Sequence, residues 1–249
     1  MAYVTRHRLM KGLRLLLTSP SLLGQKVYRG LFPTGMAYRK RFAISLREWI
    51  AYHEQHVVYE KCRWMGVLAE KNPLDAWIYQ EIIYEAKPDV VIEIGSYQGG
   101  GTLYLAHLLD LIGRGKVISI DKDRSQFKAR HPRIVEVTGD SASPEVVART
   151  AELCEGLRGM VIHDRDHLKE SVLRDLRQYS GFVAVGCYLI VEDGIQDIFT
   201  PFEPVGGFEE GPLAAVEEFL KENPCFEIDS ERERYILTYN PKGFLKRVR

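Results

Sequence analysis

The chain has 249 residues, 45% of them hydrophobic and 27% charged, which is enough for one good core but not for two full-sized domains with linkers. Lysine plus arginine and aspartate plus glutamate each number 34, so the formal net charge is zero and no overall field favours nucleic acid. No apolar run approaches the roughly 20 residues of a membrane-spanning helix, and the start of the chain lacks a secretory pattern. The four cysteines lie far apart without a CxxC pair. This spacing favours reduced thiols, and hence a cytoplasmic protein, over a disulfide framework or a zinc site.

Positive charge is concentrated at the N-terminus. Residues 1–50 contain ten Lys or Arg and one acid, a net charge of +9, whereas residues 51–249 contain 24 basic and 33 acidic residues, a net charge of −9. We expect residues 1–60 to form a basic helical extension ahead of one α/β domain at 61–249. Two interpretations of the extension remain open: a solvated appendage, or an arm that docks on an acidic partner, on anionic lipid or on the acidic body of its own oligomer.

Short β-branched runs alternate with helical stretches from residue 88 onward, and helices are expected ahead of them. We predict strands at 90–95, 116–121, 134–139, 160–164, 188–193, 226–228 and 235–239, the last two pairing as a hairpin. We predict helices near 102–111, 144–154, 167–179 and 212–222, with Ser143 as N-cap of the second and Pro144 at its first position. This alternation predicts a Rossmann-like α/β fold, with a mostly parallel seven-stranded sheet flanked by helices. Ligands bind beyond the carboxyl ends of the strands in such folds.

The first strand leads into a glycine-rich turn that begins at Glu93 and Gly95. Such a turn between strand and helix lets a ligand approach the backbone, while the helix N-terminus offers amide donors. The spacing is E-x-G-x-x-x-G and not the GxGxxG of nicotinamide binding. It resembles the first motif of class I S-adenosylmethionine methyltransferases, which implies that Glu93, Gly95, Ser96 and Gly99 bind the cofactor.

Two further strand ends strengthen this interpretation. Asp121 ends the second strand, where a carboxylate can accept hydrogen bonds from both ribose hydroxyls. Asp140 and Ser141 follow the third strand, where that fold places an acid or a hydroxyl beside the adenine. Each position alone is equally well explained as a solvated loop residue. The glycine turn, Asp121 and the pair of Asp140 and Ser141 together occupy the expected places after three successive strands, and chance explains this combination poorly.

Three carboxylates end the fourth and fifth strands, which would be neighbours in this sheet: Asp164, Glu192 and Asp193. Carboxylates that converge at one edge repel one another unless they are protonated or bound to a cation. Hard oxygen ligands without a nearby thiolate suit Mg2+. We therefore predict a magnesium site there, the alternative being an exposed acidic trio that pairs with basic residues.

His167 follows Asp164 by three residues and titrates near neutrality, as a general base must. The alternative is a capping or merely exposed histidine, and Asp166 either orients it or points elsewhere. An alcohol is a poor nucleophile, so methyl transfer to a hydroxyl needs a Lewis acid and a base. These residues fit such a reaction, with the acceptor held by magnesium on Asp164, Glu192 and Asp193 and deprotonated by His167.

Six motifs resemble the cephalosporin hydroxylase-like family, whose named members include rhamnosyl and macrolide-sugar O-methyltransferases. They span about three-quarters of the chain: 75–82 (DAWIYQEI), 91–95 (VIEIG), 164–167 (DRDH), 188–193 (YLIVED), 211–212 (GP) and 240–245 (NPKGFL). The resemblance implies a class I methyltransferase fold, magnesium dependence, a catalytic histidine at His167 and frequent oligomers. The chain departs from the family in Arg165, where a small residue is usual, and in Gln98 within the glycine turn.

These observations predict a magnesium-dependent O-methyltransferase that uses S-adenosylmethionine to methylate a hydroxyl of a sugar or glycosylated metabolite, acting as a homo-oligomer without nucleic acid. The choice of a sugar rests on the resemblance alone. A catechol-like acceptor and a non-catalytic scaffold that binds S-adenosylmethionine remain alternatives, and the intact set of acids with His167 argues against the scaffold. An iron oxygenase needs two histidines and a carboxylate on one face. No histidine follows His167, and His163 should point to the opposite face of the sheet from Asp164. These positions argue against an iron oxygenase.

Overall fold

The computed structural model describes residues 43–198 and 210–249. The chain divides into two compact units, Met1–Val57 and Val58–Arg249. The basic helical extension predicted for residues 1–60 falls mostly outside the described residues. Within the described part of the first unit, α4 (Leu46–His53) begins at Ser45, whose hydroxyl accepts from the Glu48 amide while the Glu48 side chain accepts from the Ser45 amide. This reciprocal capping box fixes the start of the helix. A π-helical turn, η2 (Glu54–Val58), follows it.

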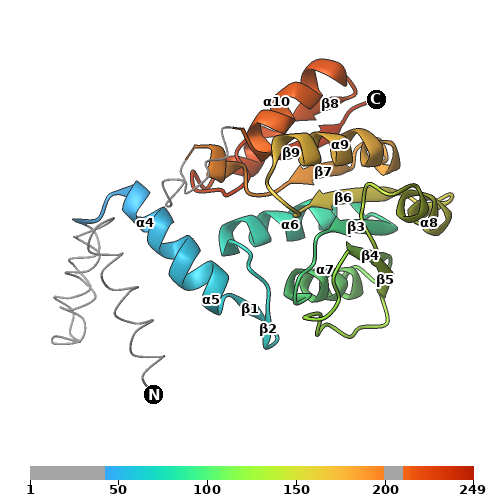
Figure 1. The fold of residues 1–249 in the computed structure, drawn as a ribbon, viewed down its shortest axis with the longest axis horizontal. Coiled ribbons are helices and arrows are strands. Elements are labelled where there is room, and N and C mark those ends of the chain that lie inside the picture. Colours follow the sequence, from blue (N-terminus) through green and yellow to red (C-terminus); the bar gives the residue numbers. More distant parts are fainter. Residues whose placement is uncertain (1–42, 199–209) are drawn as a thin grey trace. The chain divides into compact units, whose positions relative to one another are not determined.

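The second unit is built on a seven-stranded sheet in the order β5-β4-β3-β6-β7-β9-β8 (Figure 1). Its strands are β3 (Val90–Ile94), β4 (Lys116–Asp121), β5 (Ile134–Thr138), β6 (Gly159–His163), β7 (Tyr188–Val191), β8 (Phe226–Ile228) and β9 (Phe244–Arg247). The first five run parallel, and β9 pairs antiparallel with both β7 and β8. The predicted Rossmann-like α/β architecture, with a mostly parallel seven-stranded sheet, is therefore confirmed.

Helices flank this sheet (Figure 1). They are α6 (Pro73–Ala86), α7 (Gly100–Leu111), α8 (Pro144–Cys154), α9 (Lys169–Tyr179) and α10 (Pro212–Glu222). The remaining elements are α5 (Tyr59–Lys61), a small ribbon of β1 (Arg63–Trp64) and β2 (Val67–Leu68), and the short turns η3 (Ser180–Phe182), η4 (Gly194–Asp197) and η5 (Ser230–Glu233). The predicted N-cap of α8 is confirmed, because the Ser143 hydroxyl accepts from the Val146 amide at 3.3 Å and Pro144 occupies the first turn. Among the described residues, no helix has the length and apolar character needed to cross a membrane.

The hairpin predicted for 226–228 and 235–239 is wrong in its second strand. The antiparallel partner of β8 is β9, and 235–239 is irregular. Ile236 has a left-handed backbone (φ 68°) and is 84% exposed, while the Tyr239 amide donates to the Asp75 carboxylate at 2.8 Å. The alternation of large side chains resembles a strand, but the backbone of this segment bonds to α6.

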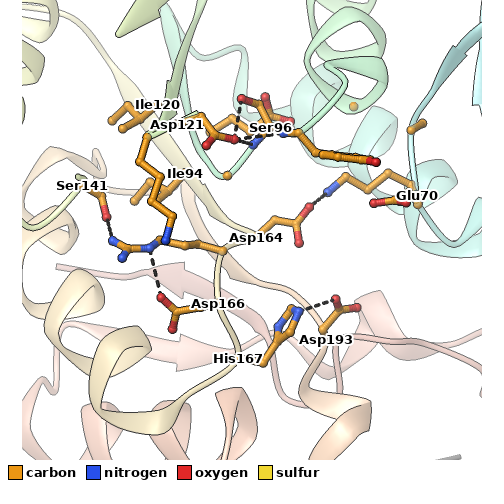
Figure 2. A pocket seen from close by; sticks show the side chains of 18 of the residues that line it. Glu70, Ile94, Ser96, Ile120, Asp121, Ser141, Asp164, Asp166, His167 and Asp193 are labelled. Carbon is orange, nitrogen blue, oxygen red and sulfur yellow. Dashed lines mark hydrogen bonds and ion pairs between the residues drawn. The ribbon is translucent and has the colours of Figure 1, made fainter. Parts of the chain in front are cut away.

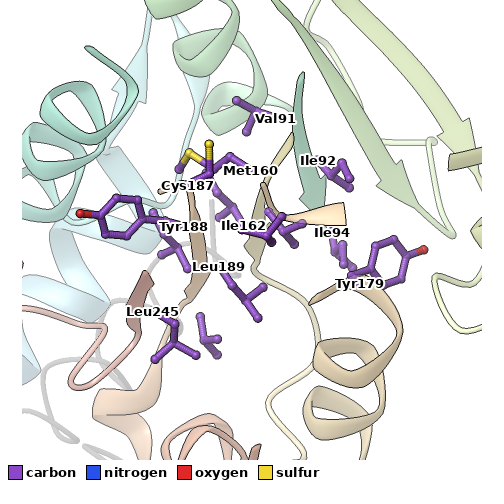
Figure 3. Packing of buried hydrophobic residues seen from close by; sticks show 14 of the residues in the cluster. Val91, Ile92, Ile94, Met160, Ile162, Tyr179, Cys187, Tyr188, Leu189 and Leu245 are labelled. Carbon is purple, nitrogen blue, oxygen red and sulfur yellow. The ribbon is translucent and has the colours of Figure 1, made fainter. Parts of the chain in front are cut away.

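The core lies along the central strands, where every residue of β3, β6 and β7 is buried. Continuous burial is expected of parallel strands that helices cover on both faces. Side chains such as Met160, Ile162 and Leu189 pack together there (Figure 3). Because β3 pairs in register with β4 and β6, its last residue Ile94 lies beside Ile120 and His163. The loops that follow these strands therefore meet at one edge of the sheet.

Candidate active site

A pocket of about 290 Å3 lies beyond the carboxyl ends of the parallel strands (Figure 2). It is lined by nine of the eleven residues singled out in the sequence: Glu93, Gly95, Ser96, Asp121, Asp140, Ser141, Asp164, His167 and Asp193. Gly99 and Glu192 are not among its lining residues. The sheet thus brings the expected cofactor-binding positions and the expected acid–base positions to one cavity.

The turn after β3 requires glycine at two positions. Gly95 has φ +90°, and a Cβ there would lie 1.8 Å from the backbone oxygen of Asp164. Gly99 has φ +85°, and a Cβ there would lie 2.6 Å from the Phe127 ring. Gly99 is the N-cap of α7. It allows the left-handed turn that starts this helix, and it does not line the pocket.

Asp121 is held as an ionised acceptor by the same turn. Its Oδ2 accepts from the Ser96 amide at 2.9 Å and from the Tyr97 amide at 3.0 Å (Figure 2). Its Oδ1 accepts from the Asp123 amide at 3.1 Å. Burial opposes ionisation, but these backbone hydrogen bonds outweigh it and lower the pKa of Asp121. A charged carboxylate at the pocket wall is suited to accept hydrogen bonds from a diol.

Arg165 joins the ends of β5 and β6. Its guanidinium donates to Asp140 Oδ1 at 2.7 Å and to the Ser141 hydroxyl, and it pairs with Asp166 at 3.2 Å. The Ser141 hydroxyl in turn donates to the buried carboxylate of Asp175 at 2.8 Å. The Arg165 side chain is only 16% exposed. Arg165, one of the two residues by which this chain departs from the resembled family, therefore orders the loop that carries Asp140 and Ser141.

Lys71 is a residue of the site that the sequence analysis missed. Its ammonium donates to Asp164 and, at 2.7 Å, to Glu192 Oε2. Burial would lower the pKa of Lys71, but Asp164, Glu192 and Glu93 together raise it, so the ammonium remains charged. No local pattern distinguishes this lysine from any other loop lysine, because its partners lie far along the chain.

The acidic side chains around Lys71 outnumber its single ammonium group. Burial and the neighbouring charge of Asp164 raise the pKa of Glu192 to about 8, with Lys71 opposing them. Burial raises the pKa of Glu93 to about 7, and burial together with Asp164 raises that of Glu70 to about 7. Glu192 Oε1 is buried and makes no hydrogen bond of good geometry within residues 43–198 and 210–249, although the buried Tyr79 hydroxyl lies beside this carboxylate. The raised pKa values indicate room for further positive charge.

The three expected magnesium ligands do not converge in the described part of the chain, where no three acid, histidine or cysteine side chains gather as a metal site. Lys71 separates Asp164 from Glu192. Asp193 has a left-handed backbone (φ 60°), and its Oδ2 lies 3.6 Å from Nε2 of His167 (Figure 2). We expect a cation to offset the repulsion between these carboxylates. The cation present is the ammonium of Lys71.

His167 lies in the loop before α9, with 29% of its side chain exposed. Burial lowers its pKa, although Asp164 and other acids oppose the shift. The neutral imidazole therefore predominates near neutral pH and can accept a proton. The carboxylate beside its ring is Asp193, whereas Asp166 accepts from the Ser171 hydroxyl at 2.9 Å.

A polar network anchors the loop after β7. Asn240 Oδ1 accepts from the Asp193 amide at 3.1 Å, and Asn240 Nδ2 donates to the Tyr79 hydroxyl at 2.9 Å. Asp75, on the same helix as Tyr79, accepts from the Thr238 hydroxyl at 2.6 Å. The motifs at 75–82, 188–193 and 240–245 are thus joined through buried hydrogen bonds beside the site.

Comparison with known proteins gives consistent results. The family model described as rhamnosyl O-methyltransferase/CmcI matches residues 56–248. A rhamnosyl O-methyltransferase of Mycobacterium leprae is 33% identical over 221 residues, which cover 86% of this chain and 95% of that protein. One of Mycobacterium tuberculosis (strain ATCC 25618 / H37Rv) is 31% identical over 241 residues, covering 91% and 96%. A solved structure of CmcI with Mg and SAM has the same fold, with a TM-score of 0.57, 21% identity and coverage of 83% and 85%.

Proposed function

Because the chain belongs to the rhamnosyl O-methyltransferase/CmcI family and is an S-adenosylmethionine-dependent O-methyltransferase, we propose that it methylates a hydroxyl of a sugar or glycosylated metabolite with the help of Mg2+. The observation that carries this proposal is the single pocket shared by the turn that holds Asp121 and the edge that holds Asp164, His167 and Asp193. Methyl transfer is an in-line displacement, so donor, acceptor and base must share one cavity.

The donor binds at the turn after β3. The charged carboxylate of Asp121 accepts hydrogen bonds from the ribose hydroxyls while the Ser96 and Tyr97 amides hold it in place. The adenine lies beside Asp140 and Ser141, in a loop that Arg165 keeps ordered. Preorganised acceptors of this kind bind without reorganising when the ligand arrives.

The Nε2 atom of His167 accepts the proton of the acceptor hydroxyl. Its lowered pKa keeps the imidazole neutral before the reaction. The Asp193 carboxylate, 3.6 Å from Nε2, stabilises the imidazolium that results. The network through Asn240 holds the backbone of Asp193 in position.

The chemistry of these acids suits a magnesium ion, although Lys71 lies between Asp164 and Glu192 in the metal-free arrangement. Asp164, Glu192 and Asp193 would hold it through hard oxygen ligands once Lys71 moves aside. The surplus of acids over Lys71, expressed in the raised pKa of Glu192, supports a further cation. When bound, magnesium supplies Lewis acidity that makes the acceptor hydroxyl easier to deprotonate.

The acceptor is tested by incubating the purified protein with S-adenosylmethionine, Mg2+ and either an aryl rhamnoside or catechol, followed by mass spectrometry. We expect methylated rhamnoside. Methylation of catechol alone would contradict the sugar assignment and favour the catechol-like alternative.

The base is tested with His167→Ala. Calorimetry should show unchanged binding of S-adenosylhomocysteine, while turnover falls by about 10^2–10^4. Binding without turnover in the wild-type protein, over a broad acceptor panel, would instead favour a scaffold.

A further inference from the structure

The loop that carries Lys71 is fixed through its backbone. The Cys62 thiol donates to the Lys71 carbonyl at 3.0 Å, and the Ala69 amide donates to the Cys62 carbonyl at 2.9 Å. The next residue, Asn72, caps α6 by accepting from the Leu74 amide at 3.2 Å. None of these bonds involves the lysine amine, so the side chain can move while its loop stays in place.

A third acid, Glu93, lies beside the Lys71 side chain. A Cβ on Gly101 would lie 2.9 Å from Lys71 Cε and 3.0 Å from Glu93 Oε1, so the lysine stem and the Glu93 carboxylate flank the same glycine. Glu93 Oε2 accepts from the Thr102 hydroxyl. The ammonium that bridges Asp164 and Glu192 thus has a further carboxylate within reach.

The formal charges of this group are not balanced. Fully ionised, the carboxylates of Asp164, Glu192 and Glu93 would carry −3 against +1 on Lys71, a surplus of −2. The raised pKa values of Glu192 and Glu93 indicate that bound protons offset part of this surplus in the metal-free protein, and one divalent cation could replace them. Glu93, Glu192 and Lys71 are 1%, 6% and 7% exposed, so solvent screens the surplus weakly. Glu70, at the pocket wall, is half-buried, and its raised pKa of about 7 reflects the same excess of acids.

We propose that Lys71 is a displaceable internal cation, which holds Asp164 and Glu192 together in the metal-free protein and moves toward Glu93 when a divalent cation binds between them. The inference rests on the proposed function in taking that cation to be magnesium. Lys71 is then a positioning residue: it prevents the two carboxylates from repelling each other, and the work of displacing it sets the affinity for the metal.

Calorimetric titration with MgCl2 tests this on Lys71→Met in the full chain. We expect magnesium to bind at least about tenfold tighter than in the wild type, because the competing charge is gone. The metal-free variant should melt at a lower temperature, and saturating magnesium should remove that difference. Lys122→Met is the matched control, since Lys122 lines the pocket but is exposed. It should leave both measurements unchanged.

A second measurement uses the wild-type protein and does not depend on the folding of a variant. With lysine labelled by 15N at Nζ, the buried ammonium of Lys71 should give a protected NMR signal, assigned by its loss in Lys71→Arg. Titration with MgCl2 should shift this signal or abolish its protection. A signal that stays unchanged while magnesium binds would overturn the inference.

The remaining outcomes separate the two proposals. Weaker magnesium binding by folded Lys71→Met would overturn the displacement, because Lys71 would then work with the metal. Displacement of Lys71 without any effect of magnesium on methyl transfer would support the inference and contradict the metal in the proposed function. Absence of magnesium binding in both proteins would overturn both.

Discussion

Replacing Gly95 by alanine tests how tightly the turn after β3 is packed against the active-site loop. The new Cβ would lie 1.8 Å from the Asp164 backbone oxygen and 2.6 Å from its carbonyl carbon. Backbone atoms cannot rotate away as a flexible side chain can, so the Asp164 peptide must shift. The substitution should therefore damage both the stability of the fold and the position of the Asp164 carboxylate.

The magnitude follows from two contributions. A left-handed backbone costs a residue with a Cβ about 1–2 kcal/mol, and overpacking typically costs about 1–3 kcal/mol more. Gly95→Ala should therefore lose about 2–5 kcal/mol of unfolding free energy, which for a unit of this size lowers Tm by roughly 10 °C.

Gly113→Ala is the matched control for this prediction. Gly113 also has a left-handed backbone, with φ +74°, but a Cβ there would meet nothing within 4 Å. It should show only the backbone contribution of about 1–2 kcal/mol. Differential scanning calorimetry of both variants, with titration of S-adenosylhomocysteine, measures the difference. Equal losses of stability in the two variants, with binding intact, would refute the reasoning from the contact with Asp164.

Three further predictions concern the chemistry of the pocket. Because the neutral form of His167 is the active one and burial lowers its pKa, kcat should fall only below the usual histidine range; a pH–rate profile with its acidic limb above that range would contradict this. Asp121→Asn should weaken S-adenosylhomocysteine binding about 10–100-fold, because an amide cannot replace a charged acceptor of the Ser96 and Tyr97 amides; an unchanged Kd by calorimetry would count against it. EDTA should abolish methyl transfer, and MgCl2 should restore it in the wild type but not in Glu192→Gln; full turnover in EDTA would exclude a metal-held acceptor.

Local signals predicted most of the fold. The start of α8 is encoded by Ser143 and Pro144, whose capping bond and fixed φ need no tertiary partner. The parallel strands are continuous apolar runs, and their alternation with helices specifies that their carboxyl ends meet at one edge. This is why the sequence predicts that residues as distant as Ser96 and Asp193 lie at one edge, and both line the pocket.

The prediction for 235–239 failed because a pattern of large side chains does not say where the backbone bonds. The Tyr239 amide bonds to Asp75, which is far away in the sequence. Likewise, sequence spacing makes Asp166 as good a partner for His167 as any other acid. Asp193 lies beside the ring instead, on a loop oriented by Asn240.

The fold and the acids at the strand ends follow from the sequence, because they depend on periodicity and on residue types at regular intervals, and the family follows from the six motifs that resemble it. How the acids are neutralised follows only from the folded structure. Lys71 is one lysine among many in the sequence, and its role exists only because folding buries its ammonium against Asp164 and Glu192. Coulombic interactions in a buried site depend on distance and solvent exclusion, and neither is encoded by local pattern.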